Sequence, residues 1–217
     1  MTRLATITDI EQVPGSRRAR RIWLDGEPFR TTSATVIKKL RLGVGDTVDP
    51  EHLATECDAA ERSAARERAV GLLARHEFSV HQLARRLADD GYGPATVDET
   101  LGRLAASGLV DDARFAEALV RTRTRAGYGL RAIRRDLDRA GVPPDLADAA
   151  LDAASDVEGA VDATAVACRL ARPHDDVHKL AARLVRRGFE FDEALAAARA
   201  ALRDGMLETA GSDDASS

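Results

Sequence analysis

The stretch "IRRDLDRAG", residues 133–141, contains the pattern that decides the fold. It places an apolar residue, a leucine and a glycine four positions apart, at Ile133, Leu137 and Gly141. Side chains four positions apart lie on one face of an α-helix, and glycine readily adopts the left-handed backbone that ends a helix. The stretch therefore predicts a helix with one buried face, ending at Gly141.

The same pattern occurs twice more, at offsets of 50 and 47 residues from this one. The two further copies are Leu83, Leu87, Gly91 and Leu180, Leu184, Gly188. Positions six and ten after each glycine are also apolar, namely Val97, Leu101, Ala147, Leu151, Ala194 and Ala198. A helical pattern precedes each copy, over residues 64–75, 112–126 and 158–171. A period of this length is typical of stacked repeats, so the sequence predicts a mainly α fold of three tandem three-helix repeats in an elongated body.

The first 50 residues have a different character. β-branched residues partly alternate over residues 4–13, a Pro-Gly turn signal follows at Pro14, and residues 17–24 can form the returning strand. Asp25-Gly26 is a second turn signal, and Ser33 has the position of a helix N-cap. We therefore expect a small β-rich N-terminal unit with one helix.

These patterns divide the chain into segments. The β-rich unit covers residues 1–50 and a linker covers 51–63. The three repeats cover 64–108, 109–155 and 156–203, and an acidic tail expected to be disordered covers 204–217. In the first helix of the first repeat, we expect Val70, Leu73 and Ala74 to share the buried face.

Composition excludes several classes of protein. Aromatic residues make up only 4% of the chain, which disfavours a protein that stacks single-stranded bases on aromatic rings. Cys57 and Cys168 form no paired motif, which fits a reducing compartment. Because no signal peptide and no apolar run of about 20 residues occurs, the chain is predicted to be cytoplasmic and not to contact a membrane.

Positive charge gathers in the middle of a chain whose net charge is −4. Residues 121–141 hold seven arginines and two acids around Gly127-Tyr128-Gly129. These arginines form either solvated helix faces or a contact surface, and we favour a contact surface because the excess is local. The candidates for binding a partner or DNA are Arg121, Arg123, Arg125, Arg131, Arg134 and Arg135, with Arg183, Arg186 and Arg187 as further candidates.

An apolar stripe should orient part of this cluster. Leu130, Ile133, Leu137 and Ala140 share one helical face, so Arg131, Arg134 and Arg135 are expected to face away from it. Smaller basic groups occur at Arg85 and Arg86 and, in the N-terminal unit, at Arg17, Arg18, Arg20 and Arg21.

Patterns that suggest enzyme or metal chemistry do not hold. Asp111 and Asp112 are interpreted as a helix cap and not as an acid–base pair. His76 and His81 are five positions apart, whereas a zinc-protease helix needs four. His174 and His178 have that spacing but no Cys or Glu partner nearby. We predict no catalytic residue, no metal and no cofactor.

Residues 107–141 resemble the RecX family, regulators of the RecA recombinase. The family's Leu-Ile-Asp-Asp…Phe-Ala segment, Gly-x-Gly hinge and repeat pattern correspond to Leu109, Val110, Asp111, Asp112, Phe115, Ala116, Gly127, Gly129, Ile133, Leu137 and Gly141. The third repeat is similar to the family's C-terminal element at Leu184, Arg187, Gly188 and Phe189. The family often has proline after the second hinge glycine, where this chain has Leu130.

The resemblance implies three three-helix repeats, no catalysis, and binding of a monomer in the groove of a RecA–single-stranded DNA filament. It also implies restraint of RecA ATP hydrolysis, strand exchange, filament growth and co-protease function, and hence a role in homologous recombination, DNA repair and the SOS response. The residues alone leave a second hypothesis open, in which a helical-repeat protein binds DNA directly.

Overall fold

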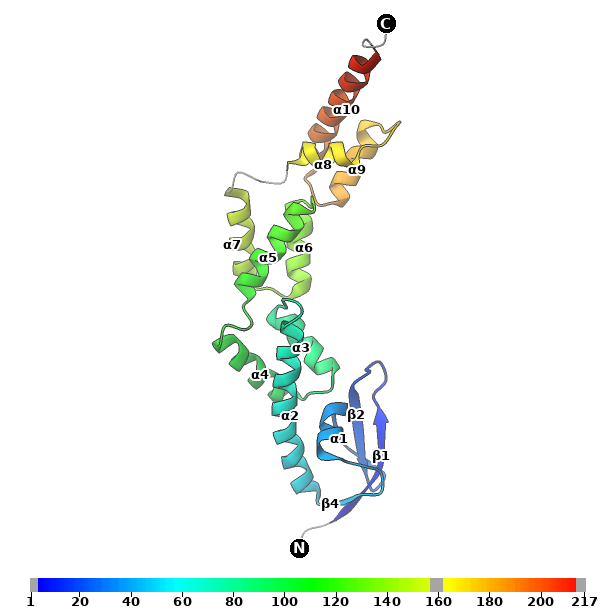
Figure 1. Ribbon diagram of the computed structural model, residues 1–217, viewed down its shortest axis with the longest axis vertical. Coiled ribbons are helices and arrows are strands. Elements are labelled where there is room, and N and C mark those ends of the chain that lie inside the picture. Colours follow the sequence, from blue (N-terminus) through cyan, green and yellow to red (C-terminus); the bar gives the residue numbers. More distant parts are fainter. Residues whose placement is uncertain (1–3, 157–161, 214–217) are drawn as a thin grey trace. The chain divides into compact units, whose positions relative to one another are not determined.

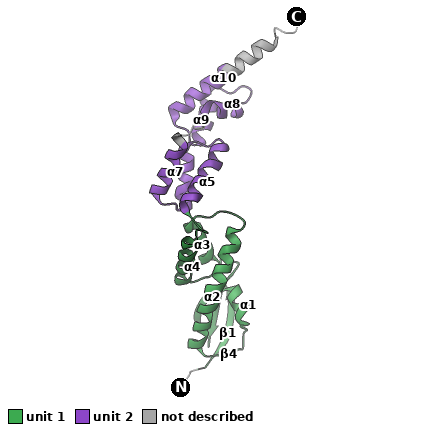
Figure 2. Cartoon of the chain, turned by 60° about the vertical axis from the view of Figure 1, so that its left-hand side comes forward, with its two compact units in different colours: residues 1–111 green, residues 112–217 purple. Residues whose placement is uncertain are grey.

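The chain folds into two compact units, Met1–Asp111 and Asp112–Ser217, which Figure 2 colours separately. The computed structural model describes residues 4–156 and 162–213. These residues form a mainly helical protein with a small N-terminal antiparallel sheet, as the sequence predicts (Figure 1).

The sheet contains four antiparallel strands in the order β3-β2-β1-β4. The strands are β1 (Ala5–Gln12), β2 (Ala19–Leu24), β3 (Glu27–Ser33) and β4 (Thr47–Val48). Asp25 and Gly26 both have positive φ, 50° and 85°, as a tight hairpin turn of the primed type requires. The side chain of Ser33 accepts a hydrogen bond from the Val36 amide and caps α1 (Ala34–Leu40). The predicted β-rich unit with one helix is confirmed.

Helix α2 (Pro50–Leu73) is longer than the sequence suggested. Asp49 caps it, and residues 51–63, which we expected to be a linker, form its first half. Its buried face is made mostly of small residues, including Ala65 and Ala69, whereas Val70 is 42% exposed. The expected burial of Val70 was wrong because closely packed alanines, and not the larger side chain, face the core.

In the described part of the chain, the nine helices from α2 onward pack in three groups of three. The first group is α2, α3 (Val80–Asp89) and α4 (Pro94–Ala106); the second is α5 (Asp112–Arg125), α6 (Leu130–Ala140) and α7 (Pro144–Asp156); the third is α8 (Ala163–Leu170), α9 (Val177–Arg186) and α10 (Phe191–Asp213). Leu87, Leu137 and Leu184, the central leucines of the pattern, are all 0% exposed. The central leucine of each copy is therefore a core residue of its group.

The three copies also end in the same way. Gly91, Gly141 and Gly188 have φ of 94°, 69° and 93°, in the left-handed region. In each copy the amide after the glycine donates to the carbonyl of the central leucine, and all three N···O distances are 3.2 Å. This is the Schellman arrangement that satisfies the carbonyls at a helix end.

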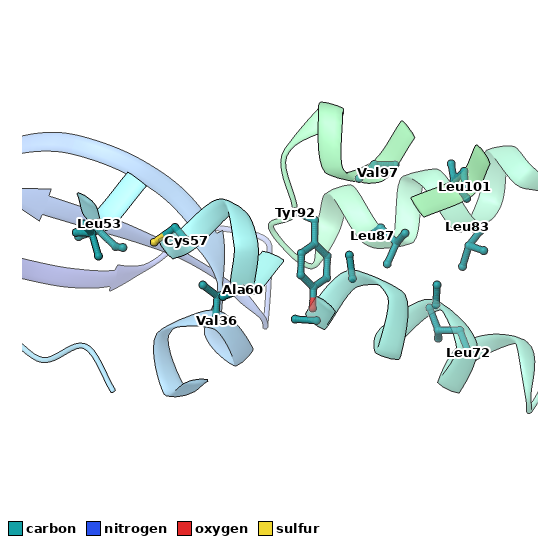
Figure 3. Packing of buried hydrophobic residues seen from close by; sticks show 14 of the residues in the cluster. Val36, Leu53, Cys57, Ala60, Leu72, Leu83, Leu87, Tyr92, Val97 and Leu101 are labelled. Atoms are coloured by element: carbon teal, nitrogen blue, oxygen red, sulfur yellow. The ribbon is translucent and has the colours of Figure 1, made fainter. Parts of the chain in front are cut away.

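The residue after the glycine completes the core of each group. These residues are Tyr92, Val142 and Phe189, and all three are buried. Figure 3 shows the ring of Tyr92 reaching from the turn after α3 toward α2, beside Leu87. Burial raises the pKa of the Tyr92 hydroxyl, which hydrogen-bonds Ser33 and Thr35. Tyr92 thereby joins the first helical group to the β-rich segment that precedes it.

At the C-terminal end the helix is again longer than expected. Helix α10 continues to Asp213, so residues 204–213 are helical and not a disordered tail. The remaining residues of the expected tail, 214–217, lie outside the described part of the chain, as do residues 157–161 at the expected start of the helix 158–171.

Candidate binding surface

The hinge Gly127-Tyr128-Gly129 joins α5 to α6 and also contacts the α9–α10 turn. The Gly129 amide donates to the Arg187 carbonyl at 2.9 Å, and the Arg131 amide donates to the Gly188 carbonyl at 3.2 Å. A Cβ atom on Gly129 would lie 2.5 Å from the carbonyl carbon of Gly188, which leaves no room for any other residue. Within this unit, the backbone therefore joins the second helical group directly to the third.

Tyr128 lies between two arginines at this junction. The guanidinium carbon of Arg123 is 5.1 Å from the ring centroid and that of Arg187 is 5.2 Å from it, which is cation–π geometry. Arg187 also donates to the Ala126 carbonyl at 3.0 Å, and Arg123 pairs with Asp136 at 2.8 Å. These two candidate arginines therefore hold the junction together.

Three other candidate arginines are paired with acids inside the same unit. Arg131 pairs with Glu190 and Arg134 pairs with Asp148. Arg183 pairs with Asp175, and this hydrogen bond lowers the pKa of the Asp175 carboxyl. Arg183 also donates to the Leu170 carbonyl at 2.8 Å, so its side chain supports the loop between α8 and α9.

Four candidate arginines remain available to a partner. Arg121 and Arg125 on α5, Arg135 on α6 and Arg186 on α9 are exposed. Among the side chains that the structure describes, in residues 4–154 and 162–203, none of the four pairs with an acid. A guanidinium that has no internal partner keeps its charge and donors for an acidic ligand.

Leu130 differs from its prediction. Ile133, Leu137 and Ala140 are buried as expected, but Leu130 is 44% exposed and is replaced on the buried face by Ala132. The reason is the close approach of Gly188, whose Cβ would lie 2.5 Å from the Ala132 Cβ, so that only a small residue fits there. Leu130 lies with Arg131, Arg134 and Arg135 around a shallow hollow between α6 and α7.

The remaining motif residues are structural in character. Phe115 and Ala116 on α5 and Phe189 after α9 are buried in the cores of their groups. Asp111 and Asp112 lie where α5 begins, which fits the expected cap. Sequence reasoning missed the contact between the hinge and the α9–α10 turn, because hydrogen bonds between two backbones leave no pattern of side chains.

The described residues were also compared with the requirements of a metal site and of a reactive thiol. Among them, no group of three or more His, Cys, Asp or Glu side chains is placed to hold a metal ion. Burial raises the pKa of the Cys57 thiol to about 11, so it stays protonated near neutral pH. No helix in this part of the chain is long and apolar enough to span a membrane.

Two of the three helical groups match models of a known protein family. Residues 65–104 match the family model described as the first three-helix domain of RecX, and residues 111–151 match the second three-helix domain of RecX. The first match covers the end of α2, all of α3 and most of α4, and the second covers α5, α6 and the first part of α7.

Curated relatives share the same name. The chain is 39% identical to "Regulatory protein RecX" of Halorhodospira halophila over 150 residues, which cover 67% of this chain and 92% of the relative. It is 33% identical to "Regulatory protein RecX" of Levilactobacillus brevis over 198 residues, covering 88% and 74%. It is 36% identical to the protein of that name from Chromohalobacter salexigens over 138 residues, covering 62% and 91%.

Solved structures agree on the fold. A crystal structure of regulatory protein RecX superposes with a TM-score of 0.56 at 23% identity, covering 87% of this chain and 96% of that one. The crystal structure of RecX from Lactobacillus salivarius has a TM-score of 0.57 at 20% identity, covering 66% and 97%.

Proposed function

The chain belongs to the RecX family, and on that premise we propose that it binds a RecA–single-stranded DNA filament and restrains RecA activity. In this proposal it acts by binding, as a monomer and without a cofactor, and it lowers RecA ATP hydrolysis, strand exchange and co-protease function. The relatives' shared name as regulatory proteins supports a role of this kind.

One observation carries the proposal. Most candidate arginines are paired inside their unit, whereas Arg121, Arg125, Arg135 and Arg186 are exposed and have no acid partner in the described residues. Together with the exposed Leu130, they provide charge and apolar area on the same unit. Protein interfaces commonly combine an apolar centre with arginine.

Binding to DNA alone is the second candidate function. Its support is the basic character of the same helices, and it requires no recombinase. Co-sedimentation separates the two functions. We expect the protein to pellet with RecA filaments on single-stranded DNA and to pellet much less with the same DNA alone. Equal pelleting with and without RecA would favour the second function.

A set of variants tests the surface. We expect Arg121→Gln/Arg125→Gln/Arg135→Gln to weaken filament pelleting by at least about tenfold, because each lost charge-assisted contact contributes about 1.5–3 kcal/mol at most and the three act together. Helicity should stay unchanged, because the three side chains are exposed.

A control with the same change in charge uses arginines already paired inside the unit. Arg131→Gln/Arg134→Gln/Arg139→Gln removes three side chains that bind Glu190, Asp148 and Asp136. We expect a smaller loss of pelleting from this variant. An equal or larger loss would contradict the assignment of the unpaired arginines.

A further inference from the structure

The hinge between α5 and α6 contacts the third helical group at two places, all within the unit Asp112–Ser217. Gly127 has a φ of 76°, and a Cβ there would lie 3.1 Å from Val166 Cγ2 and 3.2 Å from Arg169 Nη2, both on α8. The amide of Gly129, two residues further on, donates to the α9–α10 turn. The hinge is thus a point at which α8 and the α9–α10 turn both meet the second group.

Tyr128 lies at the centre of this hinge and contacts both groups. Its side chain is half-buried and packs against the core of the second group. The ring centroid is 5.1 Å from the guanidinium of Arg123, in the second group, and 5.2 Å from that of Arg187, in the third. A guanidinium is attracted to the face of an aromatic ring. The ring therefore attracts a cation from each group, and these two cations would otherwise only repel each other.

The third group offers an internal comparison. Its second helix has Asp176 as N-cap, where the second helix of the second group has Gly129. Asp175 therefore occupies the position that corresponds to Tyr128, and it pairs with Arg183 inside its own group. In the described part of the chain, no helical group follows the third. The position thus carries an aromatic ring where a further group is joined, and an acid bound within its own group where none is.

We propose that Tyr128 is a positioning residue, which holds the second and third groups in one fixed arrangement and thereby sets where Arg186 lies relative to the unpaired arginines of α5 and α6. Arg186 directly precedes Arg187 in the chain. The guanidinium of Arg187 contacts the Tyr128 ring, and its carbonyl accepts from the Gly129 amide. Movement of Arg187 away from the hinge would therefore carry Arg186 with it.

This role rests on the proposed function and deepens it, because it concerns how the unpaired arginines of two helical groups act together. Charges that are already held in place lose less conformational freedom on binding than charges that move independently. Two backbone hydrogen bonds contribute little net stability by themselves, since water competes for the same groups. The contacts of Tyr128 add an attraction between the two groups.

Amide hydrogen exchange of the full chain, followed by NMR without RecA, tests the contact between the groups. The amides of Gly129 and Arg131 report on it, because they donate to the carbonyls of Arg187 and Gly188. We expect Tyr128→Leu to speed exchange of both amides by about tenfold, since two cation–π contacts are lost together. Tyr128→Phe keeps the ring, so its amides should exchange like those of the unchanged protein.

The amides of Leu137 and Leu184, in the cores of the two groups, show whether each group stays folded. Their exchange should not change in Tyr128→Leu. Should that variant fail to fold, Arg187→Gln keeps the ring and removes the guanidinium beside it, and should speed exchange at Gly129 in the same way. Equal acceleration at the core amides would make Tyr128 a core residue only. That result, or unchanged exchange at Gly129 in both variants, would overturn the proposal.

A double-mutant cycle on filament pelleting tests the consequence for Arg186. We expect Arg186→Gln to weaken pelleting by about threefold to tenfold in the unchanged protein, and by much less in Tyr128→Leu, where Arg186 is no longer held. Arg121→Gln makes the same change in charge on α5, so its effect should be equal in both backgrounds. Additive losses from Tyr128→Leu and Arg186→Gln would contradict the positioning role.

The two measurements distinguish a failure of this role from a failure of the proposed function. A protein that does not pellet with RecA filaments would contradict the proposed function, and amide exchange would still decide whether Tyr128 holds the two groups together. Normal pelleting combined with unchanged exchange in Tyr128→Leu would contradict the role of Tyr128 alone.

Discussion

At the scale of single residues, the glycines that end the repeat helices are placed by two separate demands. Gly91 has a φ of 94°, and a Cβ there would lie 2.7 Å from the Thr32 carbonyl oxygen and 2.8 Å from the Ala19 Cβ. Gly108 has a φ of 68°, but a Cβ there would meet nothing within 4 Å. The two residues lie in the same unit and therefore separate backbone strain from steric overlap.

We expect Gly108→Ala to destabilise the compact unit Met1–Asp111 by about 1–2 kcal/mol, which is the cost of left-handed backbone for a residue with a Cβ. Gly91→Ala should cost a further 1–3 kcal/mol or so, because the added carbon overlaps the sheet. Urea unfolding followed by Trp23 fluorescence measures both losses. Equal losses would mean that the sheet moves aside without cost.

Residue identity also explains where the sequence interpretation was sound. The leucine and glycine pattern was informative because each structural demand favours one residue type. A large buried position favours leucine, and a left-handed turn favours glycine. Val70 and Leu130 were misplaced because their neighbours Ala69 and Ala132 are selected by close packing, and alanine gives no sign of which face it occupies.

At the scale of elements, a buried ion pair connects α2 to β3. Glu61 is 1% exposed, and its Oε1 accepts hydrogen bonds from the Thr32 hydroxyl at 2.6 Å and from Arg30 at 3.0 Å. Arg30 also reaches Asp58 at 3.0 Å. Asp58 and Glu61 lie within residues 51–63, so the first half of α2 carries both acids that bind Arg30.

Removing the buried charge should loosen that contact. We expect Glu61→Gln to cost about 3 kcal/mol, the lower end of the range for breaking a buried pair, because Asp58 still balances Arg30. Glu67→Gln, an exposed carboxylate on the same helix, should change stability by less than about 0.5 kcal/mol. Trp23 fluorescence during urea unfolding gives both values, and similar values for the two variants would show that Glu61 contributes little.

Element-level prediction had a clear limit. The order of helices and strands follows from local signals such as the helix cap at Ser33 and the turn at Asp25-Gly26, which the structure contains. The pairing of arginines with acids cannot be predicted from such local signals. Arg131 and Glu190 are far apart in sequence, and nothing in either segment indicates the partner. Which arginines remain free for a partner therefore became visible only in three dimensions.

At the scale of the whole molecule, each described core cluster lies within one unit. One cluster combines the sheet with α2–α4, and two others belong to α5–α7 and α8–α10. Cores that share no residues can unfold independently.

We expect two unfolding transitions in urea. Fluorescence of Trp23, the single tryptophan, reports unfolding of the unit Met1–Asp111 alone. Far-ultraviolet circular dichroism reports helices of both units, so the two unfolding curves should not coincide. Glu61→Gln should shift the fluorescence curve and leave the other transition in place. Coincident curves that shift together would show that the chain unfolds as one cooperative body.

The close approach of Gly129 and Gly188 has a consequence for building chimeras from related proteins. Each glycine leaves space for the backbone of the other helical group. A graft of α8–α10 from a relative would therefore fit only if the recipient hinge had glycine at the position of Gly129. The natural segment for exchange is therefore the pair of groups, α5 through α10, transplanted together.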